Sequence, residues 1–69
     1  SDVKELASEK VGIKQALSIV LEEIKTLDKA AKEIRTMADE DDIFDVVAMM
    51  EEHSAYYQKT IWFISSTLE

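Results

Sequence analysis

Five carboxylates lie within seven residues near the middle of the chain, in the pattern Asp-Glu-Asp-Asp-x-x-Asp over residues 39–45. Carboxylate oxygens attract cations, so this cluster is the strongest candidate for metal chemistry. An EF-hand loop requires acids at alternate positions and a central glycine, so a tight calcium site is not expected. The candidate metal-attracting residues are Asp39, Asp41, Asp42 and Asp45. We favour Asp42 and Asp45, because a three-residue step keeps two side chains on one side of a helix.

The same acids have a purely structural interpretation. Asp41 or Asp42 would be the N-cap of a helix that begins just after them, and the other acids would lie near the positive end of its dipole. One helix terminus rarely needs five acids, however, and a symmetric assembly would multiply them around an axis. Both interpretations stay open at this stage.

Other candidates for chemistry are few. His53 is the only histidine, so one chain lacks the two histidines of a ferritin-type metal site, and Met50 stands where a Glu-x-x-His motif needs its glutamate. We expect His53 to be a packed or interfacial residue; the alternative is a metal ligand completed by another subunit. Ser54 has no His–Asp partners for nucleophilic catalysis. These residues leave open whether the chain belongs to an enzyme.

Two long helices are expected to hold these residues. Apolar residues at alternating steps of four and three predict a helix over about residues 8–38, an acidic turn over 39–42 and a second helix over about 43–68. The stripe of the first helix is Ile13, Leu17, Val20, Ile24, Leu27, Ala31, Ile34 and Ala38. The stripe of the second helix is Ile43, Val47, Met50, Ser54, Tyr57, Ile61, Ile64 and Leu68.

The second helix carries another stripe beside the first, through Val46, Met49, His53, Tyr56, Thr60, Phe63 and Thr67. A helix that is apolar on more than one side is buried on more than one side. Two helices cannot cover it alone. Residues 1–69 are therefore predicted to form one all-α, antiparallel helical hairpin, half of a four-helix bundle that another chain or segment completes.

Composition narrows the classes of function. The 69 residues contain 15 acids, 8 Lys or Arg and no Cys, with a net charge of −7. The absence of thiols fits a reducing cytoplasm. All the excess negative charge lies in residues 39–69, where Lys59 is the only Lys or Arg. Proteins bind the phosphates of nucleic acid through clustered Lys and Arg side chains, so direct contact with nucleic acid is not expected. No uncharged apolar run is long enough to cross a membrane.

The end of the chain, Lys59-x-x-Trp62-Phe63-Ile64 followed by Leu68-Glu69, resembles the last helix of Dps-type miniferritins, iron-storing and DNA-protecting members of the ferritin-like superfamily. The resemblance also includes the acidic turn before that helix. It implies that this chain is the C-terminal half of such a protein, with Ser1–Ala7 at the end of the connection between two hairpins. It further implies a cytoplasmic homo-oligomer, or a partnership with a missing N-terminal half, that stores iron under stress.

In this family, carboxylates near the start of the last helix line a three-fold channel through which iron enters. Asp39, Asp41, Asp42 and Asp45 occupy the matching region. The ferroxidase ligands come from the first two helices of the family, and none can be placed on this chain. The sequence also departs from the family at Val46-Val47-Ala48, where a Thr-x-Asp stretch is common. The alternative from another class is a stand-alone hairpin that dimerises into a four-helix bundle without metal chemistry.

Overall fold

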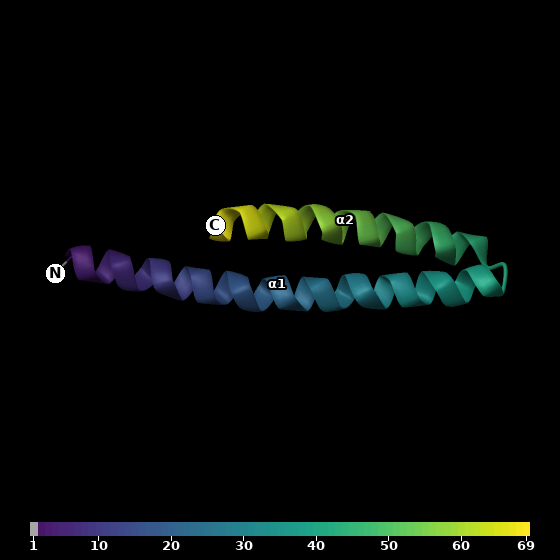
Figure 1. Ribbon diagram of the computed structural model, residues 1–69, viewed down its shortest axis with the longest axis horizontal. Helices are drawn as coiled ribbons and strands as arrows, with labels where there is room; N and C mark the ends of the chain where they lie inside the picture. Colours follow the sequence, from purple (N-terminus) through teal and green to yellow (C-terminus); the bar gives the residue numbers. More distant parts are fainter. Residues whose placement is uncertain (1) are drawn as a thin grey trace.

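The computed structural model describes residues 2–69, which form an antiparallel pair of helices (Figure 1). Helix α1 spans Asp2–Glu40 and helix α2 spans Phe44–Leu68. No strand occurs in this described part of the chain. The expected all-helical hairpin is confirmed. The hairpin measures 61 × 15 × 14 Å, and its radius of gyration is 17.0 Å, whereas a compact domain of this length has about 11 Å.

The two helices meet along one narrow seam. Its α1 side consists of the residues of that helix that are not exposed, namely Leu17, Leu21, Ile24, Asp28, Ala31, Arg35 and Ala38. Its α2 side is Val47, Met50, Ser54, Tyr57, Ile61, Ile64 and Leu68. No large side chain in the described residues is fully buried. The pair therefore has a line of contact but lacks the layered core of a complete domain.

The stripe expected on α2 faces α1, apart from Ile43, which precedes the helix and is exposed. The stripe expected on α1 is only half right. Leu17, Ile24, Ala31 and Ala38 do face α2, whereas Ile13, Val20, Leu27 and Ile34 are exposed. Leu21, Asp28 and Arg35 occupy the seam in their place. The error arose because the true seam includes charged residues, which an apolar pattern leaves out.

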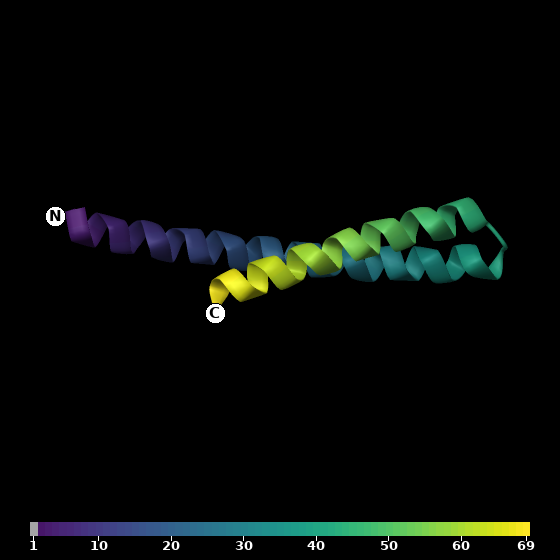
Figure 2. The same cartoon turned by 90° about the horizontal axis from the view of Figure 1, so that it is seen from above.

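Helix α1 begins at Asp2, earlier than the expected start near residue 8. Residues 2–7, expected to belong to a connection, are helical; the expectation for Ser1 lies outside the described residues. Acids in the first turn, Asp2 and Glu5, favour this early start because they lie at the positive end of the helix dipole. The first turns of α1 extend beyond the last turn of α2 (Figures 1 and 2).

The connection between the helices is a compact C-terminal cap of α1. The Ile43 amide donates to the Ala38 carbonyl at 2.9 Å, and the Asp42 amide donates to the Asp39 carbonyl at 3.2 Å. Asp42 adopts a left-handed conformation, with φ of 58°. These features define a Schellman motif, with aspartate at the position that glycine usually occupies. Aspartate tolerates this conformation better than most residues because its side chain is short and polar.

Candidate functional site

The acidic turn lies at one end of the hairpin, and all its carboxylates are exposed. The N-cap of α2 is Ile43, which makes no side-chain cap hydrogen bond. The interpretation of Asp41 or Asp42 as this N-cap is therefore wrong. Asp42 instead belongs to the end of α1, as the left-handed residue of its cap. It also lies outside α2, so the helical spacing used to pair it with Asp45 does not apply.

The acids of the turn differ in their effect on the helix ends. Asp45 lies in the first turn of α2, and its Oδ1 accepts a hydrogen bond from the Val46 amide at 2.9 Å. This placement is favourable to the helix dipole. Asp39 and Glu40 lie in the last turn of α1, where a negative charge is unfavourable and where α1 has no base. Helix capping therefore explains Asp45 and leaves Asp39 and Glu40 unexplained.

Within residues 2–69, no three His, Cys, Asp or Glu side chains are grouped so that they could hold a metal ion. His53 is exposed, and its ring stacks on Tyr57 with the centroids 6.2 Å apart. The candidate metal residues Asp39, Asp41, Asp42 and Asp45 thus form a charged surface at the turn. A single chain supplies no enclosed cation site there.

The one buried acid lies elsewhere, in the seam. Asp28 is 7% exposed, and its Oδ1 accepts a hydrogen bond from the Ser54 hydroxyl at 2.5 Å. The Nζ atom of Lys32, one helical turn later on α1, lies 2.9 Å from Oδ2. Gln58 Nε2 donates to the Ser54 oxygen at 3.3 Å. Sequence reasoning identified Ser54 as a polar residue in the core stripe but missed Asp28 across from it.

This cluster satisfies its own polar groups. The hydrogen bond from Ser54, followed by that from Lys32, lowers the pKa of Asp28 below its ordinary value, against the opposing effect of burial. No buried side-chain polar atom in the described residues lacks a partner. A satisfied polar pair in an apolar seam favours one alignment of two helices over others. We interpret the cluster as a structural element that fixes the register of the hairpin.

The two edges of the seam differ in character. One edge is polar: a shallow groove there is lined by Lys32 and Arg35 of α1 and by Glu51 and Gln58 of α2. Across it, Arg35 Nε lies 3.3 Å from Glu51 Oε2. The other edge carries an aliphatic stripe on α1. Its five residues recur at intervals of seven and are all exposed: Leu6, Ile13, Val20, Leu27 and Ile34.

The aliphatic stripe has a counterpart on α2. Residues that follow a seam residue, such as Lys32 and Gln58, share the polar edge. In an antiparallel pair, residues that precede a seam residue then share the opposite edge. At seven-residue intervals these are Val46, His53, Thr60 and Thr67 on α2, and on α1 they are Val20, Leu27 and Ile34 of the aliphatic stripe. One edge of the hairpin therefore combines the exposed aliphatic stripe of α1 with a mixed line of apolar and polar residues on α2.

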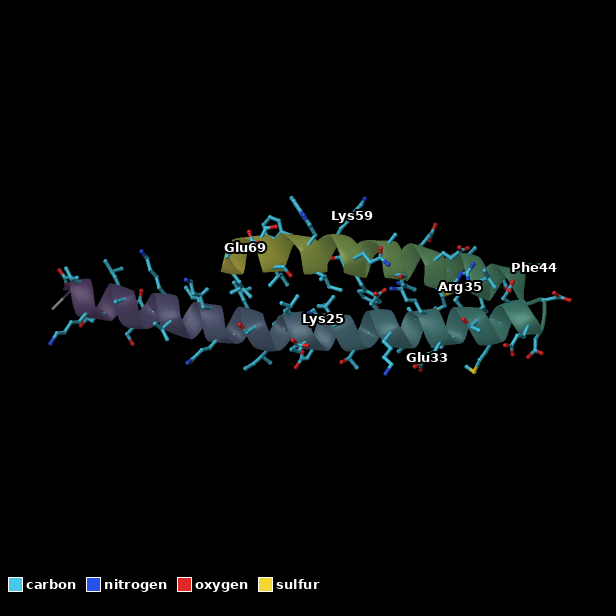
Figure 3. The ribbon with its side chains drawn as sticks, viewed as in Figure 1. Lys25, Glu33, Arg35, Phe44, Lys59 and Glu69 are labelled. Atoms are coloured by element: carbon cyan, nitrogen blue, oxygen red, sulfur yellow. The ribbon has the colours of Figure 1, made fainter. Side chains whose placement is uncertain are left out.

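Helix α2 also exposes a second apolar surface, which we call the outer face of α2. It consists of two lines with seven-residue spacing, Ala48, Ala55 and Trp62 beside Met49, Tyr56 and Phe63. Trp62 is 71% exposed, and Tyr56 and Phe63 are each 66% exposed. They line an open groove together with Lys59, which points away from α1 (Figure 3). This surface confirms that α2 is apolar on more sides than α1 covers.

The total exposed surface agrees with an unfinished domain. The chain exposes 5516 Å², whereas a compact monomer of its 7.9 kDa mass exposes about 4,400 Å². The excess is about 1,100 Å², and each partner in a stable protein–protein interface loses about 800 Å². The hairpin thus has more surface to bury than one standard interface requires.

Comparison of the chain with protein-family models, with curated proteins and with solved structures found no match. None of the helices in residues 2–69 combines the length and apolar character that crossing a membrane requires.

Proposed function

We propose that this chain is a structural module that contributes two of the four helices of a bundle. The observation that carries the proposal is the aliphatic stripe, whose five residues are all exposed along α1 and which lies beside the seam from Val20 to Ile34. In a four-helix bundle, each helix directs its seam residues and one adjacent line of residues toward the centre. On α1 that adjacent line is the aliphatic stripe, and on α2 it is the line through Val46, His53, Thr60 and Thr67. The other two helices come from a second copy or from another segment of the same protein.

The test is the molar mass of the chain in solution, measured by light scattering over a range of concentrations. We expect a mass of at least two hairpins for the unmodified chain. Replacing Leu27 and Ile34 of the stripe together by Lys should yield single hairpins, because charged side chains would then face the bundle centre. The matched control replaces Thr26 and Thr36, exposed residues of α1 outside the stripe, by Lys and should leave the mass unchanged. A single hairpin at every concentration would contradict pairing with a second copy.

A second candidate function follows from the acidic turn. In this proposal the hairpin is the C-terminal half of a Dps-like miniferritin of the cytoplasm, which stores iron and protects DNA. The support is that Asp39 and Glu40 carry charge where it destabilises α1, so capping does not account for them. No group of three His, Cys, Asp or Glu side chains suited to holding a metal ion occurs within residues 2–69. Iron enters this proposal only as the transported ion, drawn to carboxylates repeated around a symmetry axis.

This candidate requires a large closed assembly. Its test is the mass by light scattering with and without Fe²⁺, for the unmodified chain and for a variant with Asp42→Asn and Asp45→Asn. We expect Fe²⁺ to change the assembly of the unmodified chain and to have less effect on the variant. The control changes Asp2 and Glu5, two exposed acids at the far end of α1, to Asn and Gln. An identical Fe²⁺ response in variant and control would remove the support for a pore at the turn.

A further inference from the structure

The outer face of α2 lies outside any bundle that the aliphatic stripe completes. Successive residues of a helix are about 100° apart. The line through Ala48, Ala55 and Trp62 therefore points about 180° away from the bundle centre, which lies midway between the seam of α2 and the line through Val46, His53 and Thr60. Completing the bundle would therefore leave Trp62 exposed. A large aromatic surface of this kind marks an interaction site.

The charges on this face are arranged in a self-complementary way. Between the two apolar lines runs a third line, on which Glu52 and Lys59 lie seven residues apart. Lys59 forms no ion pair with an acid of its own chain in the described residues, and neither does Glu52 with a base. When two copies of α2 lie antiparallel about a two-fold axis near Ala55, Glu52 of each copy comes level with Lys59 of the other.

The side-chain sizes agree with the same register. A two-fold axis near Ala55 places Trp62 of one copy against Ala48 of the other, so a large residue meets a small one. It also places the two Ala55 residues against each other and, on the neighbouring line, the two Tyr56 rings against each other. Phe63 meets Met49 of the second copy, a flexible residue that adapts to an aromatic ring. Charge and size thus select one alignment independently.

We propose that the outer face of α2 is a two-fold interface with a second copy of this chain, in which the α2 helices pair antiparallel about Ala55. A parallel pairing is disfavoured because Lys59 would meet Lys59 and Glu52 would meet Glu52 on the line that faces the other copy. The inference goes beyond the proposed function, because it uses the surface that points away from the bundle centre. Combined with that function, it joins one bundle to another and yields an assembly larger than a pair of hairpins.

The experiment uses Trp62, the only tryptophan of the chain, as its own probe. Its fluorescence emission is recorded over a concentration series for the unmodified chain. We expect the emission maximum to shift to shorter wavelength as concentration rises, because the interface removes the indole from water. Emission that stays at the wavelength of exposed tryptophan while the mass corresponds to two or more hairpins would overturn this interface and leave the proposed function intact.

Charge reversal tests the register. Lys59→Glu converts two attractive pairs into two repulsive ones, so the concentration at the midpoint of the shift should rise by about tenfold or more. The double variant Glu52→Lys with Lys59→Glu restores both pairs and should restore the midpoint. Circular dichroism verifies that the variants keep their helix content. A double variant as weak as the single one would overturn the antiparallel register.

The stripe variant with Leu27→Lys and Ile34→Lys separates the two proposals. It should lower the mass of the assembly but keep the concentration-dependent shift of Trp62. A second readout is cross-linking of Ala55→Cys, in a chain without natural cysteines, by a short bis-maleimide. We expect covalent dimers at Ala55→Cys and none at Gln15→Cys, an exposed site on α1. Equal cross-linking at the two sites would contradict an interface centred on Ala55.

Discussion

Helix α1 has two parts, residues 2–16 and residues 17–38, which share the same seven-residue apolar repeat but differ in what surrounds them. Between Leu17 and Ala38, every third or fourth residue is covered by α2, whereas every described residue from 2 to 16 is exposed. The aliphatic stripe continues through both stretches, from Leu6 to Ile34. The regular repeat therefore does not report which residues α2 covers. It marks an exposed apolar surface on α1 that extends beyond the end of α2 (Figure 1).

The difference also concerns stability. An isolated helix of about 15 residues is marginal in water, because nucleation costs more than a few turns return. The stretch that faces α2 gains from packing and from the Asp28–Ser54 contact, which crosses between the helices. The first stretch has only its own helix propensity. Changes in the two stretches should consequently have different effects, local in one and cooperative in the other.

Removal of the buried acid is expected to have the largest effect. Asp28→Ala leaves the buried Ser54 hydroxyl without its acceptor, which costs about 1–3 kcal/mol of unfolding free energy. The measurement is denaturant unfolding at one protein concentration and one assembly state. Glu23→Ala, at an exposed site of the same helix, is the control and should change stability by less than about 0.5 kcal/mol. The double variant with Ser54→Ala should recover part of the loss. Equal effects at the two acids would contradict a structural role for Asp28.

Acid pH should weaken the same contact. Ser54 and Lys32 hold the pKa of Asp28 below its ordinary value, and the unfolded chain has an aspartate pKa of about 3.9. The contribution of Asp28 is therefore complete above about pH 4 and is lost as the pH falls through the lowered pKa. Thermal unfolding from pH 7 to pH 2 measures it as the difference between the unmodified chain and Asp28→Asn. A difference that does not change over this range would contradict the contact.

A smaller, local effect is expected in the first stretch. Gly12 is helical, and a Cβ added there would meet no atom within 4 Å. Gly12→Ala should stabilise this part of α1 by about 1 kcal/mol, since glycine is a poor helix former. Hydrogen exchange of the nearby amides should slow by roughly fivefold, with little change in global unfolding. The counterpart is Ala30→Gly, at an exposed site within the part of α1 that packs against α2, and it should lower the global free energy of unfolding. If Gly12→Ala and Ala30→Gly changed the global free energy of unfolding equally in size, the two parts of α1 would not differ in stability.

The sequence predicted the candidate surfaces correctly where the spacing of apolar residues alone determines which residues share a helix face. The seven-residue recurrence on α2 correctly predicted that this helix has more apolar surface than α1 can cover. The acidic turn was expected over residues 39–42, whereas Asp39 and Glu40 belong to the last turn of α1, and the capping role of the turn was assigned to the wrong helix. Aspartate rarely adopts a left-handed conformation. The sequence therefore did not indicate that Asp42 takes the place of the glycine that usually ends a helix in this type of cap. Assembly and iron transport stay predictions.

The sequence by itself determined two helices, their antiparallel connection and the apolar faces, because these follow from periodicity and from residues close together in the chain. Only the tertiary structure decided which stripe of α1 meets α2. Two neighbouring stripes share Leu17, Ile24, Ala31 and Ala38, and the more apolar one is not the one in contact. Asp28 and Ser54 lie 26 residues apart, and a buried polar residue is tolerated only when its partner is present. That pairing depends on the alignment of both helices, which neither residue reveals alone.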